Sequence, residues 1–158
     1  MSLKAILRSP RFRAGTLVAL GATALLGATF APAPAASALP AVTVYLSPTC
    51  GCCKKWVKHL RDNGFEVKVE EMNDVSPMKT SAGVPSDLWS CHTAVVGGYT
   101  IEGHVPAADI KRLLSEHPKI LGLSAPGMPG ASPGMDGKPE PYEVIAFGRS
   151  GEQVYAKH

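Results

Sequence analysis

The sequence predicts a single α/β domain behind an N-terminal export signal, and three observations lead to this prediction. Several short runs alternate apolar and polar residues, which is typical of half-buried strands. Two longer segments repeat apolar residues at helical spacing. The first of these helices lies between two strands, and a strand–helix–strand unit in one sheet normally makes a right-handed crossover between parallel strands.

The first 38 residues have the pattern of a secretory signal peptide. Four basic residues precede an apolar run over residues 14–31, and the small-residue sequence Ala36-Ser37-Ala38 follows. A retained anchor is the alternative, because about 18 apolar residues are enough to span a bilayer. Cleavage after Ala38 predicts a domain of residues 39–158 with no stable membrane association.

The charge of the chain argues against a nucleic-acid partner. The chain has 16 Lys and Arg and 13 Asp and Glu, a formal net charge of +3. Four of the basic residues and none of the acidic ones lie in the first 38 residues. The remaining domain is therefore close to neutral and lacks the strongly basic character of nucleic-acid-binding proteins.

The domain is expected to begin with a β-α-β unit. Residues 42–46 form a short β-rich run, and Ser47-Pro48-Thr49 interrupts it. Residues 65–69 alternate apolar and polar side chains, as a half-buried strand does. Between these strands a helix is predicted over residues 50–63, where apolar side chains recur at helical spacing: Cys53, Trp56 or Val57, and Leu60.

A tight β-hairpin is predicted next, after a polar stretch over residues 73–90 that is expected to be a loop. Residues 93–96 and 99–101 are rich in β-forming side chains. Gly97-Gly98 between them suits a two-residue turn.

A helix between Pro106 and Pro118 follows the hairpin, because proline is favoured in the first turn of a helix and often follows its end. Half of the positions in residues 122–141 are Gly or Pro, which predicts a Met-containing loop. Residues 142–155 have the pattern of a terminal hairpin. The predicted architecture is thus a β-α-β-β-β-α core with a Gly/Pro/Met-rich loop and a C-terminal β-hairpin.

The four cysteines carry the strongest functional signal. Cys50, Cys52 and Cys53 fall within four residues, and Cys91 is distant. A structural disulfide framework would join separate loops, whereas this pattern concentrates sulfur at one point, as metal or redox chemistry requires. The helix N-terminus is expected to favour thiolates there. Adjacent helical residues point in different directions, so Cys52 is expected to leave the face that carries Cys53.

The pair Cys50 and Cys53 forms a C-x-x-C motif between a strand and a helix, which is typical of a thioredoxin-like site. Redox proteins of that fold generally place a cis-proline before the third strand. Here Ser90-Cys91-His92 occupies this place, which opens the site and adds a sulfur. Soft thiolate and thioether ligands select Cu(I), and imidazole accepts either oxidation state of copper. A copper site is therefore predicted.

Two histidines and two methionines are further candidate ligands: His92, His104, Met128 and Met135. The alternatives are a loop residue for His92, a helix cap for His104 and gap-filling side chains for the methionines. Structural zinc is a weaker prediction, because zinc sites usually combine two separated C-x-x-C pairs and this chain has one.

Several motifs together resemble the CopG-type family of periplasmic copper-resistance proteins, long described as a domain of unknown function. They are the leader, C-G-C-C after a short strand, and residues 90–93, 96–99, 102–106, 126–129 and 132–135. The resemblance covers residues 42–158. It implies a thioredoxin-like fold, copper bound by Cys50, Cys52, Cys53 and Cys91, and cycling between Cu(I) and Cu(II), which is a copper oxidoreductase activity.

Other functions stay open as alternatives. A thiol–disulfide oxidoreductase would attack a substrate disulfide with Cys50 and resolve the mixed disulfide with Cys53. The missing cis-proline and the two extra thiols argue against it. A passive metal store or a structural disulfide domain is a third class. The expected partners are copper ions, bound singly or as a multinuclear cluster, and other copper-handling proteins.

Overall fold

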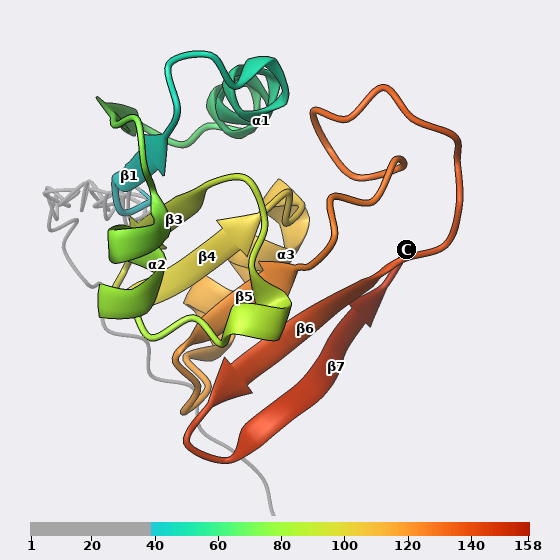
Figure 1. The fold of residues 1–158 in the computed structure, drawn as a ribbon. Coiled ribbons are helices and arrows are strands. Elements are labelled where there is room, and N and C mark those ends of the chain that lie inside the picture. The colour runs from blue at the N-terminus through green and yellow to red at the C-terminus, as the bar shows by residue number, and fades with distance from the viewer. Residues whose placement is uncertain (1–38) are drawn as a thin grey trace, which may run out of the picture. The chain divides into compact units, whose positions relative to one another are not determined.

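The computed structural model describes residues 39–158, so the predicted leader lies outside the described residues. Seven strands form one mixed sheet in the order β2-β1-β3-β4-β5-β6-β7 (Figure 1). The elements are β1 (Val42–Leu46), α1 (Gly51–Asp62), β2 (Val67–Glu71), α2 (Ser76–Ser81), the short 3₁₀ helix η1 (Ser86–Leu88), β3 (Thr93–Val96), β4 (Tyr99–Gly103), α3 (Ala107–Glu116), β5 (Gly122–Ala125), β6 (Glu143–Gly148) and β7 (Gly151–Lys157).

The predicted β-α-β unit is confirmed. β1 and β2 pair in parallel, with Val42 opposite Val67. The second strand begins at Val67 rather than Phe65, since Phe65 is buried in the connection that follows α1. The apolar positions of α1 form its buried face as the helical spacing predicted: Cys53, Trp56, Val57 and Leu60.

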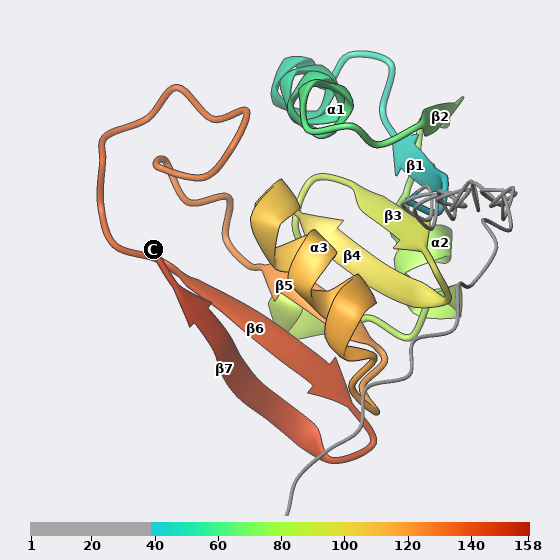
Figure 2. The same cartoon turned by 180° about the vertical axis from the view of Figure 1, so that it is seen from behind.

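The predicted hairpin and the helix after it are also confirmed. β3 and β4 pair antiparallel, and β3 pairs antiparallel with β1 on its other side. α3 follows Pro106 and ends one residue before His117, which caps it in the left-handed conformation. α3 and α2 lie on opposite faces of the sheet, as the views from the front and from behind show (Figures 1 and 2).

Two of the predicted loops were wrong in part, so the predicted core order is incomplete. Residues 73–90 contain α2 and η1. The sequence pattern missed α2 because its one buried side chain is that of Lys79, which gives no apolar periodicity. Residues 122–125 form β5, a fully buried strand parallel to β4. Its small residues resemble a loop in sequence, but Gly122 packs against the carbonyl of Thr100, where a larger side chain has no room.

The predicted terminal hairpin is confirmed as β6 and β7, and β6 pairs antiparallel with β5. The Gly/Pro/Met-rich loop is therefore shorter than predicted and runs from residue 126 to residue 142. Within the described part of the chain, no helix combines the length and the apolar character needed to cross a membrane.

Candidate functional site

The first cysteine-bearing segment is the turn at residues 50–53, where β1 leads into α1. Cys50 is the N-cap of α1, and its Sγ accepts a hydrogen bond from the backbone N–H of Cys53 at 3.4 Å. The N–H of Cys50 in turn donates to the carbonyl of Ser47 at 2.9 Å. The sulfur thus replaces the usual oxygen cap and lies at the positive end of the helix dipole.

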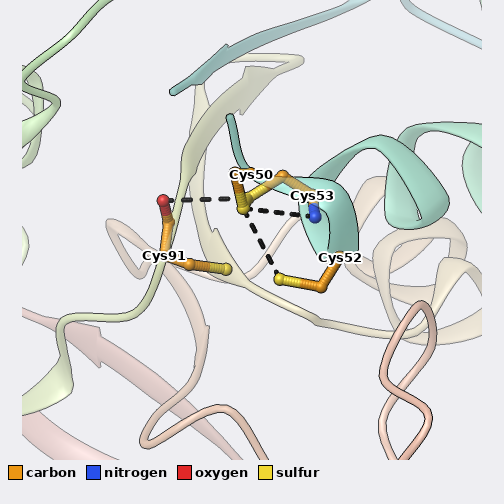
Figure 3. A group of neighbouring side chains, drawn as sticks. All are labelled: Cys50, Cys52, Cys53 and Cys91. Atoms are coloured by element: carbon orange, nitrogen blue, oxygen red, sulfur yellow. Dashed lines mark hydrogen bonds between the residues drawn. A yellow bond between two sulfur atoms is a disulfide. The ribbon is translucent and has the colours of Figure 1, made fainter. Parts of the chain in front are cut away.

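The second cysteine-bearing segment, residues 90–93, brings Cys91 to this turn. The Sγ atoms of all four cysteines lie within 4.8 Å of one another. Cys50 and Cys53 form a disulfide, and Cys52 and Cys91 are free thiols. Figure 3 shows the side chains of Cys52 and Cys91 pointing toward the same gap beside the disulfide.

As expected, Cys52 does not share the buried face of α1 with Cys53, yet its sulfur stays in the cluster. The Cys52 Sγ lies 3.5 Å from the Cys50 Sγ and belongs to the same cluster as Cys53. The reason is that these residues form the first turn of α1, where the cap residue Cys50 lies beyond the end of the helix. Cys52 and Cys53 diverge around the helix axis, but both sulfurs reach that end.

His104 is placed as an oriented neighbour of Cys91. Its Nε2 lies 2.9 Å from the Cys91 Sγ, and its Nδ1 lies 2.7 Å from the carbonyl oxygen of Pro133. A carbonyl oxygen only accepts hydrogen bonds, so Nδ1 carries the proton and the lone pair of Nε2 faces the sulfur. Burial lowers the pKa of His104, which favours this neutral form. Histidine ligands of metals are commonly oriented by such a second hydrogen bond.

The helix-cap alternative for His104 does not hold, because another histidine takes that role. The Nε2 of His59 accepts the N–H of Ala107 at 3.1 Å, at the start of α3. The sequence gives no direct signal for this contact of His59. The side chain of His104 is fully buried instead.

His92 is fully buried beside the same sulfur. Its Nδ1 lies 3.3 Å from the Cys91 Sγ, and its ring lies 4.4 Å from that of Trp56 and 5.0 Å from that of His104. Burial, reinforced by the neighbouring His104 and Lys79, lowers the pKa of His92 well below its ordinary value. Among the described residues its Nε2 has no hydrogen-bond partner. The ring is therefore neutral and held by packing, with Cys91 as its polar neighbour.

Cys91 connects two groups of potential ligands. One group is the four cysteines, and the other consists of Cys91, His92 and His104, whose ligand atoms also lie within 4.8 Å of one another. Burial first, and the adjacent Cys52 second, raise the pKa of the Cys91 thiol to about 12. Cys91 thus keeps its proton at neutral pH, and any metal ion that binds the sulfur must displace it.

The loop over residues 126–142 contacts the cysteine turn as well as His104. Asp136 forms an ion pair with Lys55 on the first turn of α1. Gly134 packs so closely on this turn that an added Cβ would lie 2.7 Å from the backbone nitrogen of Trp56 and 2.9 Å from the carbonyl oxygen of Cys52. Contacts of three loop residues, at positions 133, 134 and 136, therefore hold the loop beside the site.

The two candidate methionines of this loop lie in different surroundings. Met135 is half-buried between Gly134 and Asp136, the residues that contact α1. Met128 is 45% exposed and adopts a positive φ of 52°. The structure thus holds the chain at Met135 next to the cluster, and it leaves Met128 at the surface.

One polar group at the edge of the cluster was missed by the sequence analysis. Lys79 of α2 and Glu102 of β4 form a buried ion pair, with Nζ and Oε1 2.6 Å apart. The signal in the sequence was a glutamate next to Gly103-His104. This glutamate was used only as part of the family motif at residues 102–106, because the predicted strand ended at Ile101 and α2 was not predicted.

Comparison with protein-family models gives one match. A family model described as a protein of unknown function, DUF411, matches residues 88–135, which include Cys91, His92 and His104. No curated protein matches the chain.

Two solved structures match most of the chain. They carry the names "Copper resistance protein copG- Form 2" and "Copper resistance protein copG- Form 1", with TM-scores of 0.72 and 0.70. Each is 44% identical and covers 76% of this chain and 98% of its own chain. The chain therefore belongs to the CopG family of copper resistance proteins.

Proposed function

We propose that this protein binds copper in the periplasm through the sulfurs of Cys50, Cys52, Cys53 and Cys91 and thereby contributes to copper resistance. The convergence of four sulfurs within 4.8 Å, drawn from two distant segments, carries this proposal. Thiolates are soft ligands that select Cu(I) over most competing metals. The names of the two similar structures support the same metal and the same physiological role.

His92, His104 and Met135 complete the proposed ligand set, with Met128 as an outer member from the exposed part of the loop. His104 presents its Nε2 lone pair to the Cys91 sulfur, as a ligand poised for the same ion does. Because Cys91 belongs to both ligand groups, its thiolate is suited to bridge two ions. This shared sulfur supports a multinuclear cluster over a single ion.

The disulfide between Cys50 and Cys53 supports a redox role for the same site. When two thiols form a disulfide, they release two protons and two electrons. These electrons reduce two Cu(II) ions to two Cu(I) ions, so the pair connects the thiol state of the protein to the oxidation state of copper. A copper oxidoreductase activity follows from this balance, and two external thiols, which leave as a disulfide, must restore the dithiol for a second cycle.

A thioredoxin-like core is part of the proposal. It is supported by the parallel β1-α1-β2 unit, the antiparallel β3 and β4, and the helix α3 that follows them. Cys50 caps the start of α1 and Cys53 lies in its first turn. Cys91 lies just before β3, with its sulfur close to both of them. The proposal also includes export, with residues 1–38 as the cleaved leader. The same C-x-x-C disulfide is the observation that favours the second candidate, a thiol–disulfide oxidoreductase.

The decisive experiment is anaerobic metal binding by the reduced protein, isolated after expression of the full chain. Wild type is expected to retain Cu(I) against a competing chelator and to prefer it to Zn(II). Cys91→Ser is expected to weaken Cu(I) binding by at least about 100-fold, since it removes the sulfur common to both ligand groups. Met135→Leu is expected to weaken binding more than Met128→Leu.

The matched control is the double variant Cys91→Ser, Ser86→Cys. Ser86 is exposed on η1, so this variant restores the number of thiols without restoring the sulfur at the cluster. It is expected to bind as weakly as Cys91→Ser. Retention of neither metal by wild type, with rapid exchange of disulfide substrates, would refute the copper proposal and favour the oxidoreductase.

A further inference from the structure

The buried carboxylate of Glu102 contacts both ends of the Cys91-His92 pair. Its Oε1 accepts the backbone N–H of Ser90 at 2.6 Å, and its Oε2 accepts the hydroxyl of Thr93 at 2.7 Å. Ser90 and Thr93 are the residues directly before and after the pair. One carboxylate on β4 therefore joins the start and the end of the segment that carries two proposed ligands.

Lys79 completes this arrangement from α2. Its Nζ lies 2.6 Å from Oε1 of Glu102 and 3.2 Å from the hydroxyl oxygen of Thr93. The side chains of Lys79 and Glu102 are only 4% and 0% exposed. Removing both charges from water is expensive, and a buried ion pair is weak evidence for added stability compared with apolar residues of the same size. The Lys79–Glu102 pair is better explained by the position in which it holds the segment at residues 90–93.

The end of β4 and the residue after it hold the segment at two further points. The N–H of Gly103 donates to the carbonyl oxygen of His92 at 2.9 Å. The next residue, His104, places its Nε2 against the Cys91 sulfur. Residues 102, 103 and 104 thus contact the segment with a carboxylate, a backbone N–H and an imidazole in succession. Any shift of the segment against β4 therefore changes the distances from Cys91 and His92 to the third proposed ligand, His104.

We propose that Lys79 and Glu102 are positioning residues that hold Cys91 and His92 in register with His104 for copper binding. We call this pair the Lys79–Glu102 clamp. This role rests on the proposed copper function, and it belongs to two residues that do not bind copper themselves. The clamp acts through the hydrogen bonds of Glu102 to Ser90 and Thr93, and Lys79 compensates the buried negative charge.

Two double variants separate the hydrogen bonds of the clamp from its charges. Lys79→Met with Glu102→Met removes both charges and both hydrogen bonds but keeps an apolar interior of similar volume. Lys79→Met with Glu102→Gln also removes both charges. Its amide, however, still accepts from the Ser90 N–H with its oxygen and donates to the Thr93 hydroxyl with its nitrogen.

The expected result is a loss in the first double variant and a rescue in the second. Changes to groups that orient metal ligands typically reduce affinity by about 10- to 100-fold. We expect a loss of this size for Cu(I) in Lys79→Met, Glu102→Met, measured by chelator competition on the reduced protein. Lys79→Met, Glu102→Gln is expected to recover most of the affinity. As a control, Asp109→Asn changes a buried carboxylate that pairs with His158, and it is expected to bind Cu(I) like wild type.

A measurement without copper separates this inference from the proposed function. Hydrogen exchange of the Ser90 amide is expected to be slow in wild type and in the glutamine double variant, and fast in the methionine double variant. If the methionine double variant does not fold, Thr93→Val removes one of the two contacts and is expected to weaken Cu(I) binding in the same direction.

The outcomes are distinct. Wild-type affinity in the methionine double variant, or in Thr93→Val where that double variant does not fold, would overturn the clamp. Equal losses in both double variants would show that the charges act rather than the hydrogen bonds, and would also overturn it. A wild-type protein that does not bind copper would refute the proposed function, while Ser90 exchange would still report on the clamp as a structural contact.

Discussion

The two cysteine-bearing segments are held in place by contacts of different range. In the turn at residues 50–53, the N–H of Cys53 donates to the Cys50 sulfur and the N–H of Cys50 donates to Ser47, all within a few residues. In residues 90–93, the contacts come from β4, from the following His104 and from α2. The first half of the site forms together with one helix, whereas the second half forms only when the sheet is assembled.

This difference has a consequence for how mutations act. A change near the first segment alters a local hydrogen bond or a helix propensity, which is a small effect. A change under the second segment displaces the proposed ligands Cys91 and His92 through close packing, because interiors are dense and transmit strain. Substitutions in and around the two segments test this contrast.

Gly103→Ala is expected to destabilise the protein by about 3 kcal/mol. Gly103 has a φ of +69°, and an added Cβ would overlap the Ser90 side chain and lie 3.0 Å from the carbonyl oxygen of Ala125. Urea unfolding of the copper-free protein measures the loss, and Cu(I) affinity is expected to fall with it. Gly98→Ala is the matched control, since φ is +85° there but no atom lies within 4 Å of the added Cβ. Equal losses at both positions would mean that the second segment is not tightly packed.

Trp56→Phe is expected to cost about 2 kcal/mol. Trp56 belongs to α1, but its indole N–H donates to the carbonyl of Val105 at 2.8 Å and its ring contacts His92. It therefore connects the helix that carries the cysteine turn to the segment at residues 90–93. For this reason Cu(I) affinity is also expected to decrease severalfold.

Trp89→Phe provides the control for this variant. The indole N–H of Trp89 also donates to a backbone carbonyl, that of Val84 at 3.0 Å, but its ring is half-buried in a separate small cluster. We expect a smaller loss of stability and an unchanged Cu(I) affinity. If Trp89→Phe weakens copper binding as much as Trp56→Phe does, the contact with His92 is not the cause.

Gly51→Ala is expected to stabilise the protein by about 0.4–1 kcal/mol. Gly51 is the first residue of α1, and no atom lies within 4 Å of an added Cβ. Alanine reduces the conformational freedom of the unfolded chain without a clash. A small rise in the urea midpoint with unchanged Cu(I) affinity would support the view that the local turn tolerates change. A marked loss of affinity would contradict it.

The helix that begins at the cysteine turn was predictable because its signals are local. Buried Cys53, Trp56 and Leu60 follow the helical period, and the C-x-x-C motif marks the start. The hairpin with Gly97-Gly98 was predictable for the same reason. By contrast, α2 and β5 carry no such periodicity. One buries a lysine, and the other consists of small residues in a buried strand.

The candidate site divides in the same way. The spacing of Cys50, Cys52 and Cys53 indicated a sulfur-rich site, and the position of Cys91 before the third strand indicated where the fourth sulfur comes from. Cys52 stays in the cluster although it lies off the buried helix face that carries Cys53, because both residues belong to the first turn, at the end of the helix. The Lys79–Glu102 clamp was missed, since its two residues lie 23 positions apart in the sequence.

The sequence alone identifies a group of cysteines at a helix N-terminus, the family, and the strands and helices with a clear apolar period. Three features depend instead on the assembled fold: which nitrogen of His104 faces Cys91, how Glu102 reaches both ends of the Cys91-His92 pair, and that the chain at Met135 rather than at Met128 lies beside the cluster. The physical reason is range. Periodicity and capping act within one or two turns of chain, whereas the ligand geometry depends on hydrogen bonds and close contacts between strands and loops that are distant in sequence.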